Sequence, residues 1–224
     1  MSEKATVAKA IEIIEDNFKT VSGLSHVDFS IYPLDKHSKG MQVCTNKIKS
    51  DKHGEVFTPL WLVDDMLERL NNISWRDQSL TTEDLCAGYG QFTVRMLRKK
   101  YSLLGNKFAI KRFLLETHLF VELQPNSCFR LLYIFGKRIR LLMGDASKKS
   151  LLPDHAEIGI WVWSNVCNRW YDRTERIQDL FKKHNNKSFD VATNAIAFEE
   201  EFFKMKKGLE QKIKDRSDKY GTKK

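Results

Sequence analysis

The segment from Thr82 to Lys100 most constrains what this chain can fold into. It reads as a short strand, then a tight turn with Gly88 and Gly90 one residue apart, then a helix. Glycine adopts positive φ at little cost and lets a ligand approach the backbone closely. A turn of this kind between a strand and a helix presents bare amides and the positive helix end to polar groups of a ligand. The segment therefore predicts a ligand-binding turn in an α/β fold.

Helix and strand patterns alternate along the rest of the chain. Thr58-Pro59 opens one helix, with threonine as N-cap and proline in the first helical position. Strands that alternate with helices predict a mostly parallel sheet with helices on both faces. The other expected elements are helices at 3–20, 126–135, 171–183 and 198–214, strands at 114–123, 139–143, 158–163 and 189–192, and an irregular connector at 21–52.

Composition narrows the class of protein. At 224 residues and 42% hydrophobic content, the chain can bury the core of one sizeable domain. We expect neither a membrane span, which needs about 20 consecutive apolar residues, nor a secretory signal. The four cysteines (Cys44, Cys86, Cys128 and Cys167) are widely spaced, which argues against a zinc site or a disulfide framework. We therefore expect a soluble, cytoplasmic protein without a bound metal.

The charge balance is basic. The chain has 38 Lys and Arg residues against 29 Asp and Glu residues, a net charge of +9. This excess favours a nucleic acid as partner, because a polyanion releases counterions when basic side chains neutralise it. The alternative is that many lysines only solvate the surface, and residues 204–224 carry much of the excess as a basic helix or tail.

Three of the expected strands end in residues suited to a nucleoside. Asp84 precedes the glycine turn, Glu122 ends the next strand, and Asp145 follows Gly144 after the third. The ligands of open parallel sheets bind beyond these carboxyl ends. A carboxylate such as Glu122 accepts hydrogen bonds from ribose hydroxyls, and one such as Asp145 accepts them from an exocyclic amine. The alternatives are a helix cap before Pro125 for Glu122 and an ordinary turn for Asp145.

Four motifs in order resemble those of S-adenosylmethionine-dependent DNA adenine-N6 methyltransferases. Residues 54–59, Gly-Glu-Val-Phe-Thr-Pro, resemble the Phe-x-Thr-Pro segment of that family, which precedes the glycine turn in the adenine-N6 class. Residues 84–92 are similar to its Asp-Pro-x-x-Gly-x-Gly-x-Phe turn, with Leu85 in place of proline. Residues 120–125 and 142–146 resemble its Glu-Leu-Asp-Pro strand end and its Gly-Asp-Ala turn.

The resemblance implies a Rossmann-like methyltransferase fold that binds S-adenosylmethionine. It places Phe57, Thr58 and Pro59 against the methionine end of the cofactor. It assigns Asp84, Gly88 and Gly90 to the cradle for the amino acid portion, Glu122 to the ribose and Asp145 to the adenine amine. It also implies DNA, or RNA, as the substrate.

The catalytic segment of that family departs most from this sequence. The family has Asn-Pro-Pro followed by an aromatic residue, in which the asparagine orients the target amine and the aromatic ring stacks on the flipped base. The most similar segment here is Asn194-Ala195-Ile196-Ala197, and the rival is Asn165, followed by Val166 and Cys167. The alternative role for Asn194 is to cap the terminal helix.

We expect an N-terminal helix and connector (1–52), a methyltransferase-like domain (53–203) and a basic C-terminal segment (204–224). An insertion at 147–187 brings tryptophans together with Arg169, Arg173 and Arg176, which suits either base stacking with phosphate contact or a tryptophan core. The rest of the family's sheet and its target-reading region have no counterpart, so a partner chain would supply sequence recognition. Three functions stay open: DNA adenine-N6 methylation, cofactor or nucleic-acid binding without chemistry, and methylation of another substrate.

Overall fold

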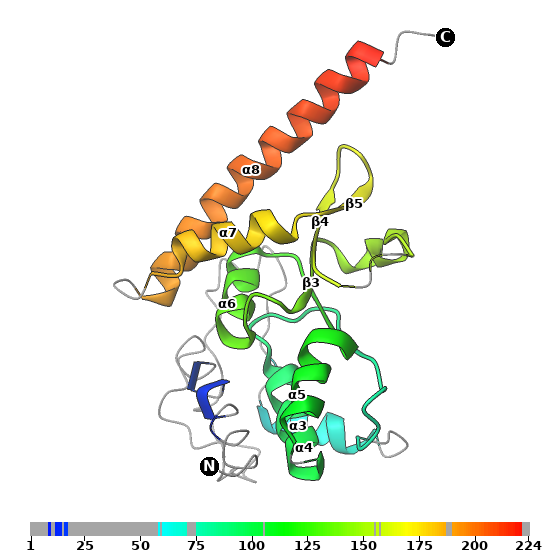
Figure 1. Ribbon diagram of the computed structural model, residues 1–224, viewed down its shortest axis with the longest axis vertical. Coiled ribbons are helices and arrows are strands. Elements are labelled where there is room, and N and C mark those ends of the chain that lie inside the picture. Colours follow the sequence, from blue (N-terminus) through cyan, green and yellow to red (C-terminus); the bar gives the residue numbers. More distant parts are fainter. Residues whose placement is uncertain are drawn as a thin grey trace.

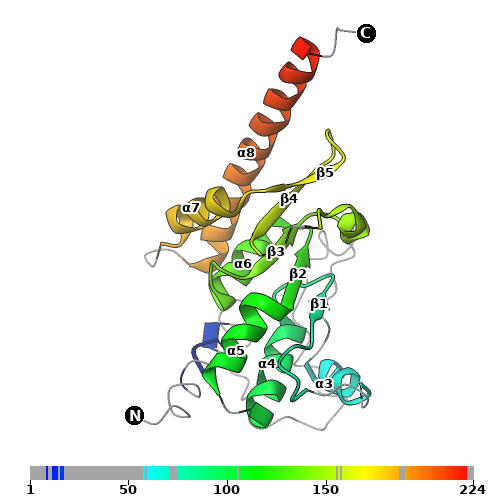
Figure 2. The same cartoon turned by 45° about the vertical axis from the view of Figure 1, so that its right-hand side comes forward.

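The computed structural model is built on a five-stranded sheet in the order β1-β2-β3-β4-β5 (Figure 1, Figure 2). The pairings β1–β2, β2–β3 and β3–β4 are parallel, and β4–β5 is an antiparallel hairpin. The structure describes residues 9, 12–14, 16–17, 58, 60–70, 75–104, 106–154, 156, 158–186 and 190–220. The strands are β1 (Thr82–Asp84), β2 (His118–Glu122), β3 (Arg140–Met143), β4 (Ile160–Ser164) and β5 (Arg169–Asp172).

Helices precede and connect these strands and end the described part of the chain. They are α3 (Leu60–Glu68), α4 (Gln91–Leu104), α5 (Lys107–Arg112), the π-helix η2 (Phe113–Thr117), α6 (Pro125–Phe135), the 3-10 helix η3 (Ala146–Leu151), α7 (Thr174–His184) and α8 (Val191–Tyr220). The α/β class with a mostly parallel sheet is confirmed. The predicted strand, glycine turn and helix appear as β1, the turn and α4.

The two faces of the sheet are covered differently. Side chains such as Phe120, Leu141 and Val162 point to one face and join a core with apolar residues of α3 to α8. Their neighbours along the strands point to the other face, where the buried cluster is Leu119, Val121, Leu142, Trp161, Trp163 and Trp170. In the described part of the chain this second face is covered by the connection from Ala146 to Ala156, and not by the α-helices expected there. The β1–β2 and β2–β3 connections advance in one direction, so crossovers of the same hand place their helices on one face, whereas the β3–β4 connection crosses on the other face.

The tryptophans of the predicted insertion therefore fill a core. Trp163 and Trp170 lie edge to face with ring centroids 5.4 Å apart, and Trp170 Nε1 donates to the Lys148 carbonyl. Both rings are almost fully buried. Of the two roles that the sequence left open for these residues, the structural one is confirmed.

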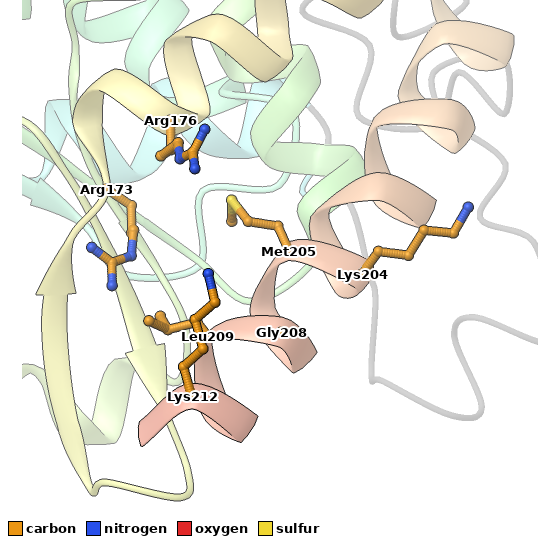
Figure 3. Close-up of a pocket in the computed structure, with 7 residues that line it drawn as sticks. All are labelled: Arg173, Arg176, Lys204, Met205, Gly208, Leu209 and Lys212. Atoms are coloured by element: carbon orange, nitrogen blue, oxygen red, sulfur yellow. The ribbon is translucent and has the colours of Figure 1, made fainter. Parts of the chain in front are cut away.

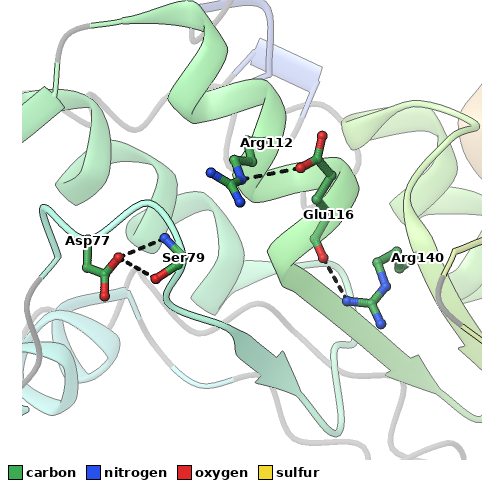
Figure 4. Close-up of polar contacts among 5 residues, drawn as sticks. All are labelled: Asp77, Ser79, Arg112, Glu116 and Arg140. Atoms are coloured by element: carbon green, nitrogen blue, oxygen red, sulfur yellow. Dashed lines mark hydrogen bonds and ion pairs between the residues drawn. The ribbon is translucent and has the colours of Figure 1, made fainter. Parts of the chain in front are cut away.

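The strand expected at 114–123 begins only at His118. Residues 113–117 instead extend α5 as a π-helix. The start of α5 itself is fixed by Asn106, whose side chain accepts a hydrogen bond from the Ala109 amide. Figure 4 shows how this segment is held: the Arg140 guanidinium at the start of β3 donates to the Glu116 carbonyl at 2.8 Å, and Arg112 pairs with the Glu116 carboxylate. Figure 4 also shows the loop before β1, where Asp77 accepts two hydrogen bonds from Ser79. The apolar run at 114–123 alone could not distinguish a strand from an extension of the preceding helix.

The strand expected at 189–192 is wrong, because Val191 already begins α8. Asp190 caps this helix, its carboxylate accepting hydrogen bonds from the amide and the hydroxyl of Thr193. Ala195, Phe198 and Phe202 recur at helical spacing and are buried. They lie along the face that packs on α6, and α8 continues without interruption across the expected boundary at 203–204.

The other expected elements are confirmed, begin at a different residue, or lie outside the described residues. The helix at 58–70 appears as α3, held to α4 by a two-point ion pair between Asp64 and Arg95. Residues 12–14 are helical, whereas the connector at 21–52 lies outside the described residues. The helix expected at 171–183 begins at Thr174, because Tyr171 and Asp172 belong to β5. No helix in the described part of the chain is both long and apolar enough to span a membrane.

Two glycines give opposite predictions for the same substitution. Gly90 has φ of +89° and a Cβ there would lie 2.4 Å from the buried Phe135 ring, so Gly90→Ala should lower the free energy of unfolding by about 2 kcal/mol. Gly208 lies inside α8 with nothing within 4 Å of a Cβ, so Gly208→Ala should raise it by about 1 kcal/mol. Urea denaturation measures both. Equal effects would contradict the environments described.

Candidate functional site

The three predicted acidic residues lie at one edge of the sheet. Asp84, Glu122 and Asp145 end or follow β1, β2 and β3, which are adjacent and parallel. The pKa of the Cys86 thiol, in the glycine turn, indicates that all three carboxylates lie near this turn. This pKa is raised first by burial and then by the negative charges of Glu122, Asp84 and Asp145. The sheet therefore brings these three carboxylates together around the turn.

Glu122 is the group that ties the turn to the second strand. One carboxylate oxygen accepts a hydrogen bond from the Gly88 amide at 2.8 Å, and the other accepts one from the Gln124 amide at 2.7 Å. Gly88 has φ of +52°, in the left-handed region that glycine favours, so its amide can be turned toward the carboxylate. The expected alternative, in which Glu122 caps the helix at Pro125, is thus partly realised.

Asp84 is a buried carboxylate with incomplete hydrogen bonding. Only 8% of its surface is exposed, and its Oδ2 has no hydrogen-bond partner. Burial raises its pKa to about 6, and hydrogen bonds from the Cys86 amide and the Thr93 hydroxyl oppose this rise. A buried, unsatisfied acceptor is costly, so such a group at a sheet edge suggests a ligand donor or a catalytic role.

The remaining predicted cradle residues differ in what they can contribute. Asp145 is exposed and caps η3, accepting a hydrogen bond from the Ser147 amide that lowers its pKa. Gly90 is in contact with Phe135 and so serves the packing of α6 against the turn. Thr58 is partly buried before α3, and Phe57 and Pro59 lie outside the described residues.

Neither catalytic candidate belongs to this cradle. Asn194 lies within α8, 7% exposed, and its side-chain amide donates to the Asn186 carbonyl. It does not cap the helix, since Asp190 holds that position. Asn165 lies in the β4–β5 hairpin turn and accepts a hydrogen bond from Trp163 Nε1. Because β2 and β3 separate β4 from β1, the ends of β4 and β1 lie about 14 Å apart.

His118 and Thr93 lie near the cradle, and nothing in the sequence predicts a role for either residue. His118 is fully buried at the start of β2, with hydrogen bonds between Nδ1 and the Thr82 hydroxyl and between Nε2 and the Thr93 hydroxyl. Because Thr93 also donates to Asp84, a chain of hydrogen bonds runs from the histidine to the buried carboxylate. A lone histidine in an apolar strand predicts nothing of this kind.

The chemistry of the site is that of an anionic cradle for a polar, cationic ligand. No group of three or more His, Cys, Asp or Glu side chains in the described residues is placed to hold a metal ion. Comparisons with protein-family models, with curated proteins and with solved structures find no match for this chain.

Proposed function

We propose that this chain binds S-adenosylmethionine at the carboxyl ends of β1, β2 and β3, as a methyltransferase-like protein that does not itself carry out methyl transfer. The observation that carries the proposal is the hydrogen bond of the Glu122 carboxylate to the Gly88 amide, with Asp84 buried beside the same turn. The motif resemblance assigns these residues to the ribose and the amino acid portion of the cofactor.

Electrostatics support a cationic nucleoside. S-adenosylmethionine carries a sulfonium and an ammonium group, and opposite charge stabilises ionised carboxylates. Three carboxylates act together on Cys86, so a positive ligand at the turn would meet a favourable negative potential there. The unsatisfied Asp84 Oδ2 suits the ammonium group, and the motif resemblance assigns the Glu122 carboxylate to the ribose hydroxyls.

The proposal stops short of catalysis because neither asparagine that could match the catalytic segment lies beside β1. Adenine-N6 methylation needs an acceptor such as an asparagine side chain close to the methyl group. Asn194 is engaged within α8, and Asn165 is three strands away. A partner chain would have to provide this acceptor and the sequence recognition. DNA or RNA is then the substrate that such a complex would meet, in keeping with the basic charge.

Replacement of Glu122 by glutamine should weaken cofactor binding about tenfold or more. The amide removes one acceptor and sets an N–H donor against the Gly88 amide or a ribose hydroxyl. Isothermal titration calorimetry with S-adenosylmethionine measures the effect. The matched control is Glu116→Gln, an exposed carboxylate on η2 at the other end of β2, which should leave affinity unchanged. An absence of measurable binding by the unmodified chain would overturn the proposal.

Transfer of a tritiated methyl group distinguishes the open functions. We expect no transfer from S-adenosylmethionine to DNA, RNA or protein by this chain alone at a concentration that saturates binding. Transfer to unmodified DNA that Asn194→Ala or Asn165→Ala abolishes would instead establish the catalytic function and assign its residue. Transfer to RNA or protein alone would establish the third function.

A further inference from the structure

A second candidate site lies between α7 and α8, on a different part of the molecule. It is a groove with a volume of about 390 Å³, and its lining contains Arg173 and Arg176 from the start of α7 and Lys204 and Lys212 from α8. None of its described lining residues is acidic. Figure 3 shows Arg173, Arg176 and Lys212 extending into the space between the helices, whereas the ammonium group of Lys204 lies on the outer side of α8.

The floor of the groove is apolar and open. It is formed by Met205 and Leu209, with Gly208 between them on α8. Glycine is among the least favourable residues inside a helix, and no packing contact requires it here, because nothing lies within 4 Å of the position of a Cβ. The absence of a side chain leaves the backbone accessible to a ligand.

The basic surface continues beyond the groove in two directions. Toward β5, Arg169 and Arg173 lie over the Tyr171 ring, with guanidinium carbons 4.6 and 5.4 Å from its centroid. Toward the C-terminus, α8 projects away from the body of the molecule (Figure 1). Residues 204–220 contain seven basic and three acidic side chains, so this projecting half supplies much of the net positive charge.

We infer that the groove between α7 and α8 binds the sugar–phosphate backbone of a nucleic-acid strand. Converging guanidinium and ammonium groups suit phosphate oxygens, and an apolar floor with a neighbouring aromatic ring suits sugars and bases. A linear polyanion fits a track from β5 along α8 better than a flat membrane surface does. This inference is independent of the cofactor proposal, because the groove shares no residue with the cradle.

The test measures binding of a fluorescein-labelled 20-nucleotide single strand by anisotropy at several salt concentrations. The variant Arg173→Glu/Arg176→Glu should bind about tenfold or more weakly, and the slope of log affinity against log salt should fall by about 1.5. The matched control is Arg69→Glu/Lys111→Glu, which makes the same charge change at exposed positions just after α3 and on α5. An equal loss in both variants would mean that only net charge matters and would overturn the inference.

A second pair of variants tests the groove without a charge change. Gly208→Leu should fill the floor and weaken binding about tenfold, whereas Gly208→Ala should stay within about twofold of the unmodified chain. Circular dichroism checks that both variants keep α8. Equal affinity of the leucine and alanine variants would overturn the groove as the site. Binding of poly-glutamate or of phosphatidylserine vesicles as tightly as the single strand would overturn the assignment to nucleic acid.

Discussion

Replacement of His118 by glutamine is expected to make the stability of the protein rise as the pH falls from 6 to 4, where the contributions of His118 and Asp84 otherwise nearly cancel. His118 is fully buried, and burial, with the nearby Arg140 charge, lowers its pKa to about 3. The folded state therefore binds fewer protons than the unfolded state, whose histidine has an ordinary pKa of about 6.5. The stability that His118 contributes is complete above pH 6.5 and is lost as the pH falls toward 3. This loss reaches about 5 kcal/mol.

Asp84 acts in the opposite direction over nearly the same range. Its pKa is raised to about 6 in the folded state, so the folded protein binds more protons than the unfolded chain between pH 6 and 3.8. Stability from this group rises as the pH falls, by about 3 kcal/mol in all. In the unmodified chain the two contributions nearly cancel between pH 6 and 4. Measurement of the free energy of unfolding against pH in the unmodified chain would therefore reveal neither contribution.

The glutamine variant exposes the Asp84 contribution. Glutamine cannot titrate, and its amide can still accept from Thr82 and donate to Thr93. We therefore expect its free energy of unfolding to be lower than that of the unmodified chain at pH 8, and to rise by about 3 kcal/mol from pH 6.5 to 4. Urea denaturation at each pH measures this. The control His184→Gln, beside Glu201 at the end of α7, should keep the flat profile. A flat profile for His118→Gln would refute the opposing pair.

The sequence predicts an element when contacts within a few residues determine its structure. It does not when contacts with distant segments do. Local patterns were enough for β1, the glycine turn and α4, because glycine chemistry and helical periodicity act within a few residues. They were also enough to place Glu122 and Asp145 at one edge, since parallel strands align their carboxyl ends. They failed at Val191, where the cap at Asp190 and the packing of Phe198 on α6 decided for a helix. The resemblance to a family strand predicts an extended segment there, against these local helix signals.

The order of the strands lay beyond the sequence for a different reason. Trp163 and Trp170 are paired across the β4–β5 hairpin, and they pack against Gly144 at the end of β3 where β4 joins the sheet. The pairing of β4 with β3 extends the sheet away from β1 and carries Asn165 with it. The buried link from His118 through Thr93 to Asp84 is likewise a contact between three elements, which no single segment reveals. The cradle residues could be predicted, but the hydrogen bonds that hold Asp84 could not.

Replacement of Asp84 by asparagine should make the protein more stable at pH 8 and weaken cofactor binding at least tenfold. Ionised Asp84 costs the fold about 3 kcal/mol at this pH, from a pKa raised to about 6. Asparagine removes the charge but places an unsatisfied amide donor where Oδ2 lies, which costs about 1 to 2 kcal/mol. The net gain is about 1 to 2 kcal/mol. It should reverse near pH 4, where the unmodified carboxyl group is already protonated in the folded state.

A binding experiment tests whether the destabilising charge on Asp84 serves to bind the cofactor. If Asp84 pairs with the ammonium group of S-adenosylmethionine, affinity in the unmodified chain should fall as the pH is lowered through 6, by up to about tenfold per unit. The asparagine variant should bind at least tenfold more weakly at pH 8 and lose this pH dependence. The control Glu83→Gln, the neighbouring carboxylate paired with Lys149, should keep both affinity and its pH dependence. A more stable variant that binds as tightly as the unmodified chain would show that the buried charge serves no cofactor.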